Sequence, residues 1–204
     1  MISEEAPIVF TDGKALIEIN PDRYARAGIK MYSDDWSEFF SDLDDKETVL
    51  ETKEGFLLSD PNGVRVYLAN GNLELDYELK SESFGLIGNY NGLSIEAHDF
   101  ERTIKFWENA GFSHKDGDLE HGWGVFSNGS NVDISIMKPL MCPHLFFNPG
   151  INYFNAGKNL TTIGKLREAG IGITEEITHF NTDGVVDNVI VRDPGGYGFF
   201  VFND

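Results

Sequence analysis

Gly92-Leu-Ser-Ile-Glu-Ala-His-Asp-Phe100 is the stretch of sequence that decides the fold. Apolar residues alternate with small or polar ones through its first half, which is the period-two pattern of a β-strand with one buried face. The pattern then becomes helical, because Asp99 is a good N-cap and Gly111 is placed to end a helix as its C′ residue. The stretch therefore predicts a strand that leads directly into a helix over residues 99–111.

The same strand-to-helix pattern occurs three times in the chain. The copies are residues 28–36, 92–100 and 152–160, and they start 64 and 60 residues apart. Internal similarity at a nearly constant period indicates repeated structural modules. In the third copy we expect Asn159 to cap the helix and Gly170 to end it.

Each copy also ends in an apolar run typical of a strand. These runs are residues 64–69, 132–137 and 198–203. Two of them follow the turn signals Asp60-Pro-Asn-Gly63 and Asp193-Pro-Gly-Gly196, in which proline fixes one dihedral angle and glycine permits a positive φ. These signals predict tight hairpins into the last strand of the module.

The N-terminal segment looks like the end of a further copy. Residues 8–13 and 15–20 predict a hairpin without the strand and helix that open the other copies. The chain thus contains three and a half modules.

The polar stretch of residues 70–91 is the best linker candidate, although its apolar residues between Leu73 and Leu79 alternate well enough for an edge strand. We place the boundary near Glu82. This gives an N-terminal part, residues 1–82, of one and a half modules and a C-terminal part, residues 85–204, of two paired modules.

The composition excludes some classes of partner. The 204 residues include 34 acidic and 16 basic ones, a formal charge of −18, which opposes binding to a nucleic acid backbone or an anionic membrane. The charge favours solubility or the attraction of a cationic ligand.

Cys142 is the single cysteine, so no intrachain disulfide can form. Residues 1–7 lack the basic and apolar regions of a signal peptide, and no apolar window is long enough to span a membrane. We expect a cytoplasmic protein with no membrane association.

The repeat resembles that of the glyoxalase, bleomycin-resistance and extradiol dioxygenase superfamily, also called the vicinal oxygen chelate superfamily. Its modules read βαβββ and end in Asp-Pro-x-Gly followed by an apolar strand. The resemblance covers residues 85–204 well and residues 8–69 more loosely. It implies an α+β fold in which paired modules form curved mixed sheets around a cavity, with the helices on the outer face, and in which residues 1–82 form an incomplete domain of the same kind.

The resemblance also implies that the usual metal site is lost. Metal enzymes of the superfamily often carry histidine at the start of the first strand of a module and glutamate on the last strand. The corresponding residues are Gly28, Gly92 and Asn152 on the first strands, and Tyr67, Ser135 and Phe200 on the last, with Glu18 in the incomplete module. Since glycine and phenylalanine offer no donor atom to a divalent cation, we expect neither a metal ion nor another cofactor.

No catalytic residue is identified from the sequence. The histidines are scattered without the close spacing of a metal motif; they are His98, His114, His121, His144 and His179. Cys142 lies close to His144 in sequence, but not at a spacing that defines a nucleophile and its base, so a buried or incidental thiol is favoured. The chain contains no nucleophile elbow, phosphate loop or dinucleotide fingerprint. Enzymatic activity is left open.

The aromatic residues indicate where a ligand would bind. Alternation along the last strand places Phe200 on the concave face with Asn152, and Phe199 and Val201 on the other face, against helix 99–111. On the concave face the aromatic residues either line a pocket or fill it as core. The expected ligand-binding residues are Ser94, Glu96, Trp123, Ser135, Asn152, Phe154 and Phe200.

Three functions remain open. The first is metal-independent binding of a flat or cationic small molecule, of the kind by which bleomycin-resistance proteins sequester a ligand. The second is a metalloenzyme of the superfamily, a lyase, isomerase or dioxygenase, with atypical ligands such as Glu18, Glu96 and His98. The third is a non-catalytic structural or interaction module.

We also expect a homodimer. The N-terminal part forms an incomplete barrel, and its apolar residues require cover; they include Ile17, Ile19, Met31, Val66 and Leu68. In the alternative, this part folds onto the C-terminal part of its own chain as a monomer.

Overall fold

The computed structural model describes residues 8–21, 23, 25–44 and 47–203, and these residues form three βαβββ modules preceded by a hairpin. The hairpin consists of β1 (Ile8–Thr11) and β2 (Leu16–Ile19). The first module consists of β3 (Gly28–Ser33), α1 (Ser37–Ser41), β4 (Leu50–Glu51), β5 (Gly55–Ser59) and β6 (Arg65–Asn70).

The second and third modules have longer helices. The second consists of β7 (Asn89–Glu96), α2 (Phe100–Asn109), β8 (Ser113–Asp118), β9 (Trp123–Ser127) and β10 (Asp133–Met137). The third consists of β11 (Gly150–Phe154), α3 (Asn159–Glu168), β12 (Ile173–Ile177), β13 (Asn188–Arg192) and β14 (Gly198–Phe202). The predicted α+β class, the three repeats and the N-terminal hairpin are confirmed.

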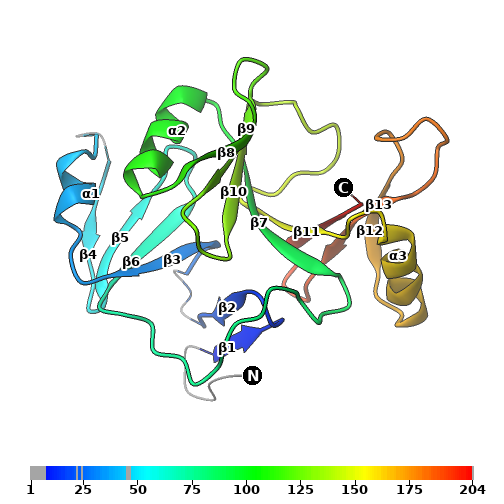
Figure 1. The fold of residues 1–204 in the computed structure, drawn as a ribbon, viewed down its shortest axis with the longest axis horizontal. Coiled ribbons are helices and arrows are strands. Elements are labelled where there is room, and N and C mark those ends of the chain that lie inside the picture. The colour runs from blue at the N-terminus through cyan, green and yellow to red at the C-terminus, as the bar shows by residue number, and fades with distance from the viewer. Residues whose placement is uncertain (1–7, 22, 24, 45–46, 204) are drawn as a thin grey trace.

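The second and third modules share one sheet of eight strands in the order β12-β13-β14-β11-β7-β10-β9-β8 (Figure 1). Each module pairs its first and last strands in parallel, and the first strands β7 and β11 join the modules by antiparallel pairing. The first module forms a separate four-stranded sheet in the order β3-β6-β5-β4. The sheets are curved but not closed, as expected of incomplete barrels.

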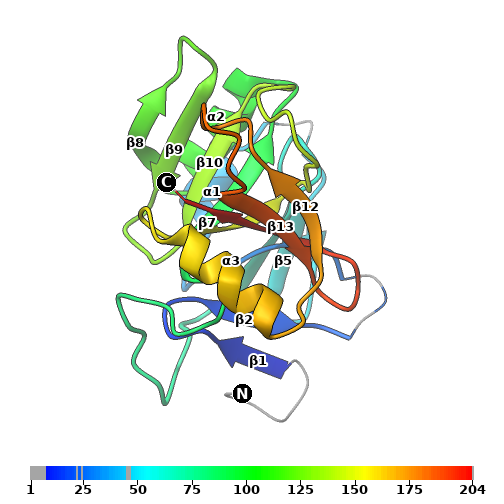
Figure 2. The same cartoon turned by 90° about the vertical axis from the view of Figure 1, so that its right-hand side faces the viewer.

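Each long helix covers the outer face of its own module. Trp107 on α2 packs in one core cluster with Ile95 and Ile134, while Leu166 on α3 packs with Val201. Figure 2 shows α3 lying beside β12 and β13 of the third module. Phe199 and Val201 therefore lie on the outer face as predicted, but the prediction that they pack against helix 99–111 is wrong. Alternation identifies the face of a strand, whereas the covering helix depends on how the modules are arranged.

The predicted ends of the second helix are confirmed, and one predicted cap of the third is wrong. The Asp99 side chain accepts a hydrogen bond from the backbone N–H of Arg102 at 3.2 Å, and Gly111 has a φ of 89°. Asn159 does not cap α3 but begins it, and its buried side chain donates to the carbonyl oxygens of Asp187 (2.6 Å) and Val201 (2.9 Å). The amide is buried in the core, where it satisfies carbonyl groups that would otherwise lack partners.

The first module packs on the second within the same chain. Val66 and Leu68 on β6 are buried in one core cluster with Phe106 and Trp107 on α2. Met31 packs against the same cluster, Ile17 is half-buried and Ile19 is 53% exposed. Much of the apolar surface from which we expected a homodimer is therefore covered inside the chain, and the dimer stays a prediction, as does the boundary near Glu82.

The linker runs along the N-terminal hairpin instead of forming an edge strand. Residues 71–88 contain no strand. The backbone N–H groups of Lys80 and Phe84 donate to the carbonyl oxygens of Gly13 and Asp12, both at 2.7 Å, so this segment finds its partners at the hairpin turn. Among the described residues, none of the helices has the length and apolar character needed to cross a membrane.

Candidate ligand-binding site

The candidate site lies on the inner face, which we define as the face of the eight-stranded sheet opposite α2 and α3. Ser94 on β7 is the register partner of Ser135 on β10, and Asn152 on β11 is the partner of Phe200 on β14. Register partners in neighbouring strands present their side chains on the same face. The structure thus brings four of the predicted site residues into adjacent positions across four strands.

Ser94 and Asn152 form a buried polar pair at the join between the two modules. The Asn152 side-chain NH₂ donates to the Ser94 hydroxyl, and the side chains are 2% and 5% exposed, respectively. The other polar atom of the Asn152 side chain, Oδ1, is buried and has no hydrogen-bond partner. A buried acceptor without a partner costs about 1–3 kcal/mol. A hydrogen-bond donor placed at Oδ1 would remove this cost.

Close contacts with neighbouring atoms explain why glycine occupies two positions on the inner face. A Cβ atom at Gly92 would lie 1.9 Å from the carbonyl oxygen of Asp133, and the residue has a φ of 152°. A Cβ atom at Gly150 would lie 2.2 Å from the ring of Phe200. The backbone of β10 therefore excludes a side chain at Gly92, where metal enzymes of similar sequence pattern often carry histidine, and Gly150 leaves room for a buried aromatic ring.

Glu96 anchors a loop. Its Oε1 accepts the backbone N–H of Leu140 at 2.6 Å, and its carbonyl oxygen accepts the side-chain NH₂ of Asn148 at 3.1 Å. Both donors belong to residues 138–149, which we call the 138–149 loop and which connects β10 to β11. The carboxylate predicted as a possible base or cation contact is thus already engaged with the protein.

Aromatic side chains fill the inner face of the third module. Phe200 is 1% exposed, and its ring centroid lies 5.4 Å from those of His144 and Phe146 in the 138–149 loop. Phe154 lies half-buried with its centroid 5.7 Å from that of Phe202. Of the two alternatives for the aromatic residues, filling the face as core describes this half of the sheet.

Trp123 lies at the rim of the candidate site. It is the register partner of Met137, which is in turn the partner of Glu96, and its side chain is 41% exposed. Of the seven predicted residues, Trp123 is thus the one that solvent reaches most readily at the end of the second module.

Sequence reasoning missed the contribution of the 138–149 loop. His144 is 8% exposed, and its Nδ1 lies 2.9 Å from the carbonyl oxygen of Leu145. Its Nε2 is buried without a partner. The available signal was the pair Phe146-Phe147 in a segment without periodicity, since neighbouring aromatic residues in a loop indicate that the loop packs on the protein.

The thiol of Cys142 is not activated. Burial, together with the charge of Glu96, raises its pKa to about 11, and its Sγ lies 3.2 Å from the sulfur of Met137. A nucleophilic cysteine requires a lowered pKa and a base or cation beside it. Cys142 is half-buried, and this environment agrees with the interpretation of its thiol as incidental and not catalytic.

The donor set of the inner face does not fit a divalent metal ion. Its central polar groups are the amide of Asn152 and the hydroxyls of Ser94 and Ser135, whereas such sites use imidazole, thiolate or carboxylate ligands. The atypical ligands considered from the sequence are not gathered: Glu18 on β2 pairs with Lys30 at 3.1 Å, and His98 is exposed. Across the described parts of the chain, no three His, Cys, Asp or Glu side chains are grouped to hold a metal ion.

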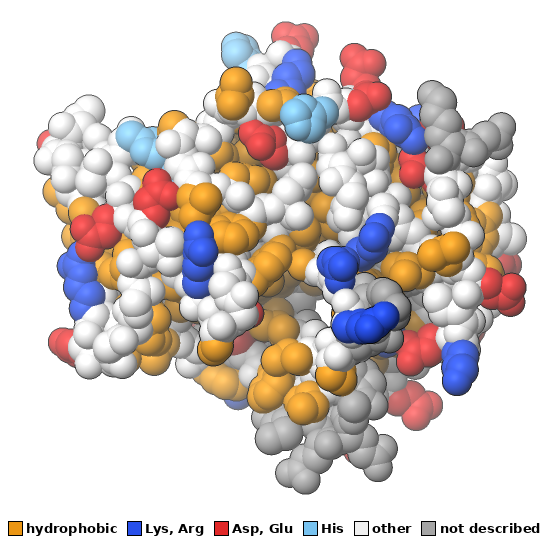
Figure 3. Space-filling model, turned by 180° about the vertical axis from the view of Figure 1, so that it is seen from behind, with side chains coloured by type: hydrophobic (Ala, Val, Ile, Leu, Met, Phe, Trp, Pro, Cys, Tyr) orange, Lys and Arg blue, Asp and Glu red, His pale blue; other side chains and the backbone are white. Residues whose placement is uncertain are grey.

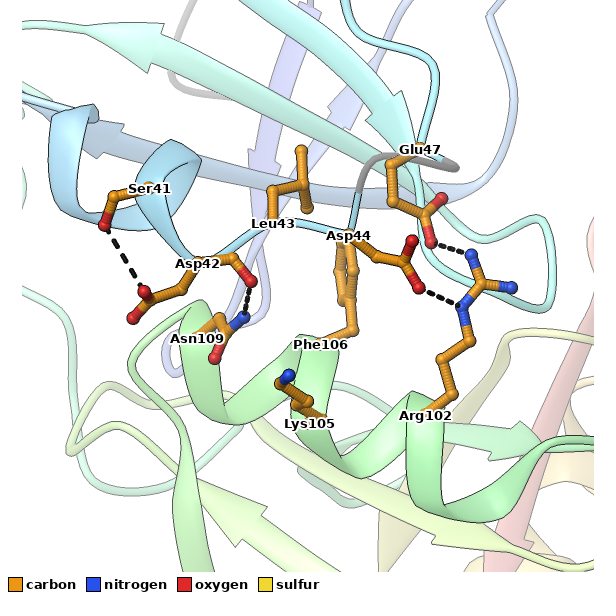
Figure 4. A pocket seen from close by; sticks show the side chains of 9 residues that line it. All are labelled: Ser41, Asp42, Leu43, Asp44, Glu47, Arg102, Lys105, Phe106 and Asn109. Atoms are coloured by element: carbon orange, nitrogen blue, oxygen red, sulfur yellow. Dashed lines mark hydrogen bonds and ion pairs between the residues drawn. The ribbon is translucent and has the colours of Figure 1, made fainter.

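A separate groove lies away from the inner face, between α1 and α2 (Figure 4). Its volume is about 610 Å³. Arg102 contacts the carboxylates of Glu47 and Asp44, so these three charges in the groove are paired with one another. The space-filling view from behind shows that the acidic side chains on this face are scattered and not gathered in one patch (Figure 3). Neither feature marks a binding site for a cation.

Similarity to known proteins is found at the level of structure. No protein-family model matches the sequence, and no curated protein matches it. A halotolerant catechol dioxygenase is similar over 94% of this chain and 72% of its own, with 11% identity and a TM-score of 0.53. The Mn(II)-bound glyoxalase from Novosphingobium aromaticivorans is similar over 98% of this chain and 71% of its own, with 15% identity and a TM-score of 0.53.

A variant of 4-hydroxymandelate synthase from Streptomyces coelicolor is similar over 91% of this chain and 75% of its own, with 12% identity and a TM-score of 0.53. The TM-scores indicate a shared architecture. Identities this low leave the chemistry open. Together with the βαβββ modules described above, these similarities show that the chain shares its fold with a catechol dioxygenase, a glyoxalase and a 4-hydroxymandelate synthase.

Proposed function

We propose that this protein binds a small molecule on the inner face of the eight-stranded sheet without using a metal ion. The observation that carries the proposal is the Asn152 side chain, whose Oδ1 is buried at the join of the modules with no hydrogen-bond partner. The position opposite it, Gly92, excludes a side chain. The centre of the face thus offers hydrogen bonds to a ligand where similar folds place metal ligands.

The surroundings favour a flat ligand that carries a hydrogen-bond donor. Phe200 lies beside Asn152 in register, so an aromatic ring adjoins the polar pair. Ligand sites combine apolar and aromatic walls with a few polar groups that set orientation. A ligand N–H or O–H group directed at Oδ1 would remove the cost of the unsatisfied acceptor. A neutral or cationic ligand suits a chain of charge −18.

We assign ligand binding to this face and no catalytic step. The carboxylate of Glu96 is engaged by the 138–149 loop, and the pKa of Cys142 is raised to about 11. Neither group is prepared to act as a base or a nucleophile. Fold alone does not decide between binding and catalysis.

The test is a thermal-shift screen of planar amines, phenols and nitrogen heterocycles against the wild-type protein and the Asn152→Leu variant. We expect at least one compound to raise the Tm of the wild-type protein and not that of Asn152→Leu, which lacks the acceptor. Without ligand, the Tm of Asn152→Leu should stay close to that of the wild type, because removal of the unsatisfied Oδ1 offsets the loss of the hydrogen bond to Ser94.

The matched control is Asn128→Leu, which changes an exposed asparagine in the β9–β10 turn and should preserve every ligand response. If no compound shifts the wild-type Tm, or if Asn152→Leu responds as the wild type does, the proposed site is wrong. The inner face would then be core in a scaffold or interaction module.

A further inference from the structure

The 138–149 loop places one of its own rings inside an aromatic cluster. His144 is surrounded by the rings of Phe200 and Phe202 on β14 and of His179 and Phe180 after β12, which we call the aromatic cluster. The centroid distances from His144 are 5.4, 5.6, 6.0 and 6.1 Å, respectively. The His179 ring is nearly parallel to that of His144, with an interplanar angle of 18°.

Polar contacts hold the His144 ring only weakly in this position. Its Nδ1 interacts with Leu145 of the same loop, and its Nε2 is buried without a partner, although the whole residue is 8% exposed. The ring therefore gains contacts with other rings but leaves a nitrogen unsatisfied, which opposes its burial. Nothing in the aromatic cluster supplies a hydrogen bond that is specific to a histidine.

Two backbone N–H groups tie residues 139–145 of the loop to the sheet, whereas residues 146–149 are held more firmly, by Phe146 against Phe200 and by the Asn148 side chain on the Glu96 carbonyl oxygen. The backbone N–H of Leu140 donates to Glu96, and that of Leu145 donates to Glu175 Oε2 at 2.9 Å. Leu140 has a φ of 66°, a left-handed conformation that costs a non-glycine residue about 1 kcal/mol or more, and its side chain is 92% exposed. Residues 139–145, a strained segment with two carboxylate ties, can leave the sheet while residues 146–149 stay packed and the strands stay folded.

We propose that His144 is a built-in plug: its imidazole occupies the site of a planar nitrogen heterocycle, and binding of that ligand displaces residues 139–145 of the 138–149 loop. This inference rests on the proposed function and names its ligand class. The ring now in the aromatic cluster is itself a planar nitrogen heterocycle, and a flat ligand ring can replace its contacts with Phe180, Phe200 and Phe202. The loop thereby sets the affinity of the site.

Benzimidazole is the probe, because it is a planar nitrogen heterocycle whose N–H group can donate a hydrogen bond to Asn152 Oδ1. The Kd is measured by titration into protein with labelled isoleucine methyl groups, followed by NMR. Ile177 and Ile190 pack with Phe200 in one cluster and report on the aromatic cluster, whereas Ile95 and Ile134 pack beneath α2 on the outer face and serve as internal controls. Only the first pair should shift.

Two variants weaken the plug in different ways. His144→Ala removes the ring, and Glu175→Ala removes one tie of the loop while keeping the ring. We expect both to bind benzimidazole about tenfold or more tightly than the wild type, because a site that is open about 1–10% of the time has its apparent Kd raised by the inverse of that fraction. The matched control is Glu176→Ala, which changes the next residue on β12, paired with Arg167 on the outer face, and should bind as the wild type does.

Each other outcome overturns the inference. Tighter binding by His144→Ala alone would mean that the substitution merely creates a cavity. Equal binding by all variants, with shifts at Ile177 and Ile190, would leave the proposed function standing without a plug. Absence of shifts at these methyl groups in every variant would remove the heterocycle site, and the Asn152 screen would then decide the proposed function separately.

Discussion

The indole Nε1 of Trp107 on α2 donates a hydrogen bond of 3.2 Å to Oδ2 of Asp60, which lies in the turn between β5 and β6. Both residues are buried, and Oδ1 of Asp60 accepts the backbone N–H groups of Asn62 and Val64. The predicted Asp60–Gly63 turn therefore also connects the first module to the helix of the second. A turn residue with this many buried contacts belongs to the core as much as to the hairpin.

The first prediction concerns the pH dependence that Asp60 confers. Burial raises its pKa above the ordinary 3.8, although the hydrogen bonds from Val64, Asn62 and Trp107 oppose the shift. A carboxyl group with a raised pKa binds its proton more tightly in the folded state, so its contribution to stability is present below the unfolded pKa and is lost as the pH rises through the folded pKa. Asp60→Asn removes this titration.

The free energy of unfolding of the wild type, minus that of Asp60→Asn, should therefore fall as the pH rises from about 4 to 7. Urea denaturation at a series of pH values measures it. The control is Asp183→Asn, which changes an exposed aspartate and should leave the difference flat. A difference that rises with pH would show that the hydrogen bonds lower the pKa of Asp60 in the folded protein.

The second prediction concerns the glycine beneath Phe200. Gly150→Ala should lower the free energy of unfolding by about 1–3 kcal/mol, because the new methyl group meets the Phe200 ring and the core must move. Gly164→Ala is the matched substitution, since Gly164 lies within α3 with no atom in reach of the new methyl group. It should raise stability by about 0.5–1 kcal/mol. Equal effects of the two substitutions would show that Phe200 does not fill this space.

The third prediction concerns the metal. Gly92→His should not create a metal site and should lower the free energy of unfolding by about 3 kcal/mol or more, because the Cβ atom collides with the carbonyl oxygen of Asp133 and the φ of 152° is unfavourable. The wild-type protein, incubated with Mn²⁺, Zn²⁺, Fe²⁺ or Ni²⁺ and desalted, should retain no stoichiometric ion by elemental analysis. A retained ion whose binding is abolished by Asn152→Leu would overturn this expectation.

The fourth prediction concerns assembly. We expect a homodimer with the N-terminal part at its interface, which light scattering after size-exclusion chromatography would report as about twice the chain mass of 22.8 kDa. The remaining exposed apolar residues near the hairpin include Ile19, Phe84 and Leu86, at 53%, 64% and 48% exposure. Phe84→Ser should weaken the dimer, whereas Leu160→Ser on the exposed side of α3 should not. A wild-type mass near that of one chain at micromolar concentration would show a monomer.

Much of the fold was predictable because its signals are local. The alternation in residues 92–100, the cap at Asp99 and the turn at Asp193–Gly196 each act within a few residues, and the structure confirms them. Repetition of these signals along the chain then defined the modules. The same alternation placed Asn152 and Phe200 on one face in the correct register.

The errors lie where a residue acts through distant partners. Asn159 has the side chain of a helix cap, but its amide reaches carbonyl groups of Asp187 and Val201 far along the chain. The helix beneath Phe199 was misassigned because strand periodicity carries no information on the covering element. The 138–149 loop has no periodicity at all, and its position depends on Glu96 and Glu175 on two different strands.

The position of α2 has a consequence for how the molecule denatures. One side of the helix belongs to the core beneath β7 and β10, and Phe106 on the same helix meets Phe39 of α1 at a centroid distance of 5.9 Å. The β7–β11 pairing in turn connects the second module to the third. Loss of the second module would deprive both of its neighbours of buried surface. We therefore expect the modules that repeat in the sequence to unfold as a single cooperative unit, and calorimetry should record one transition for the whole chain.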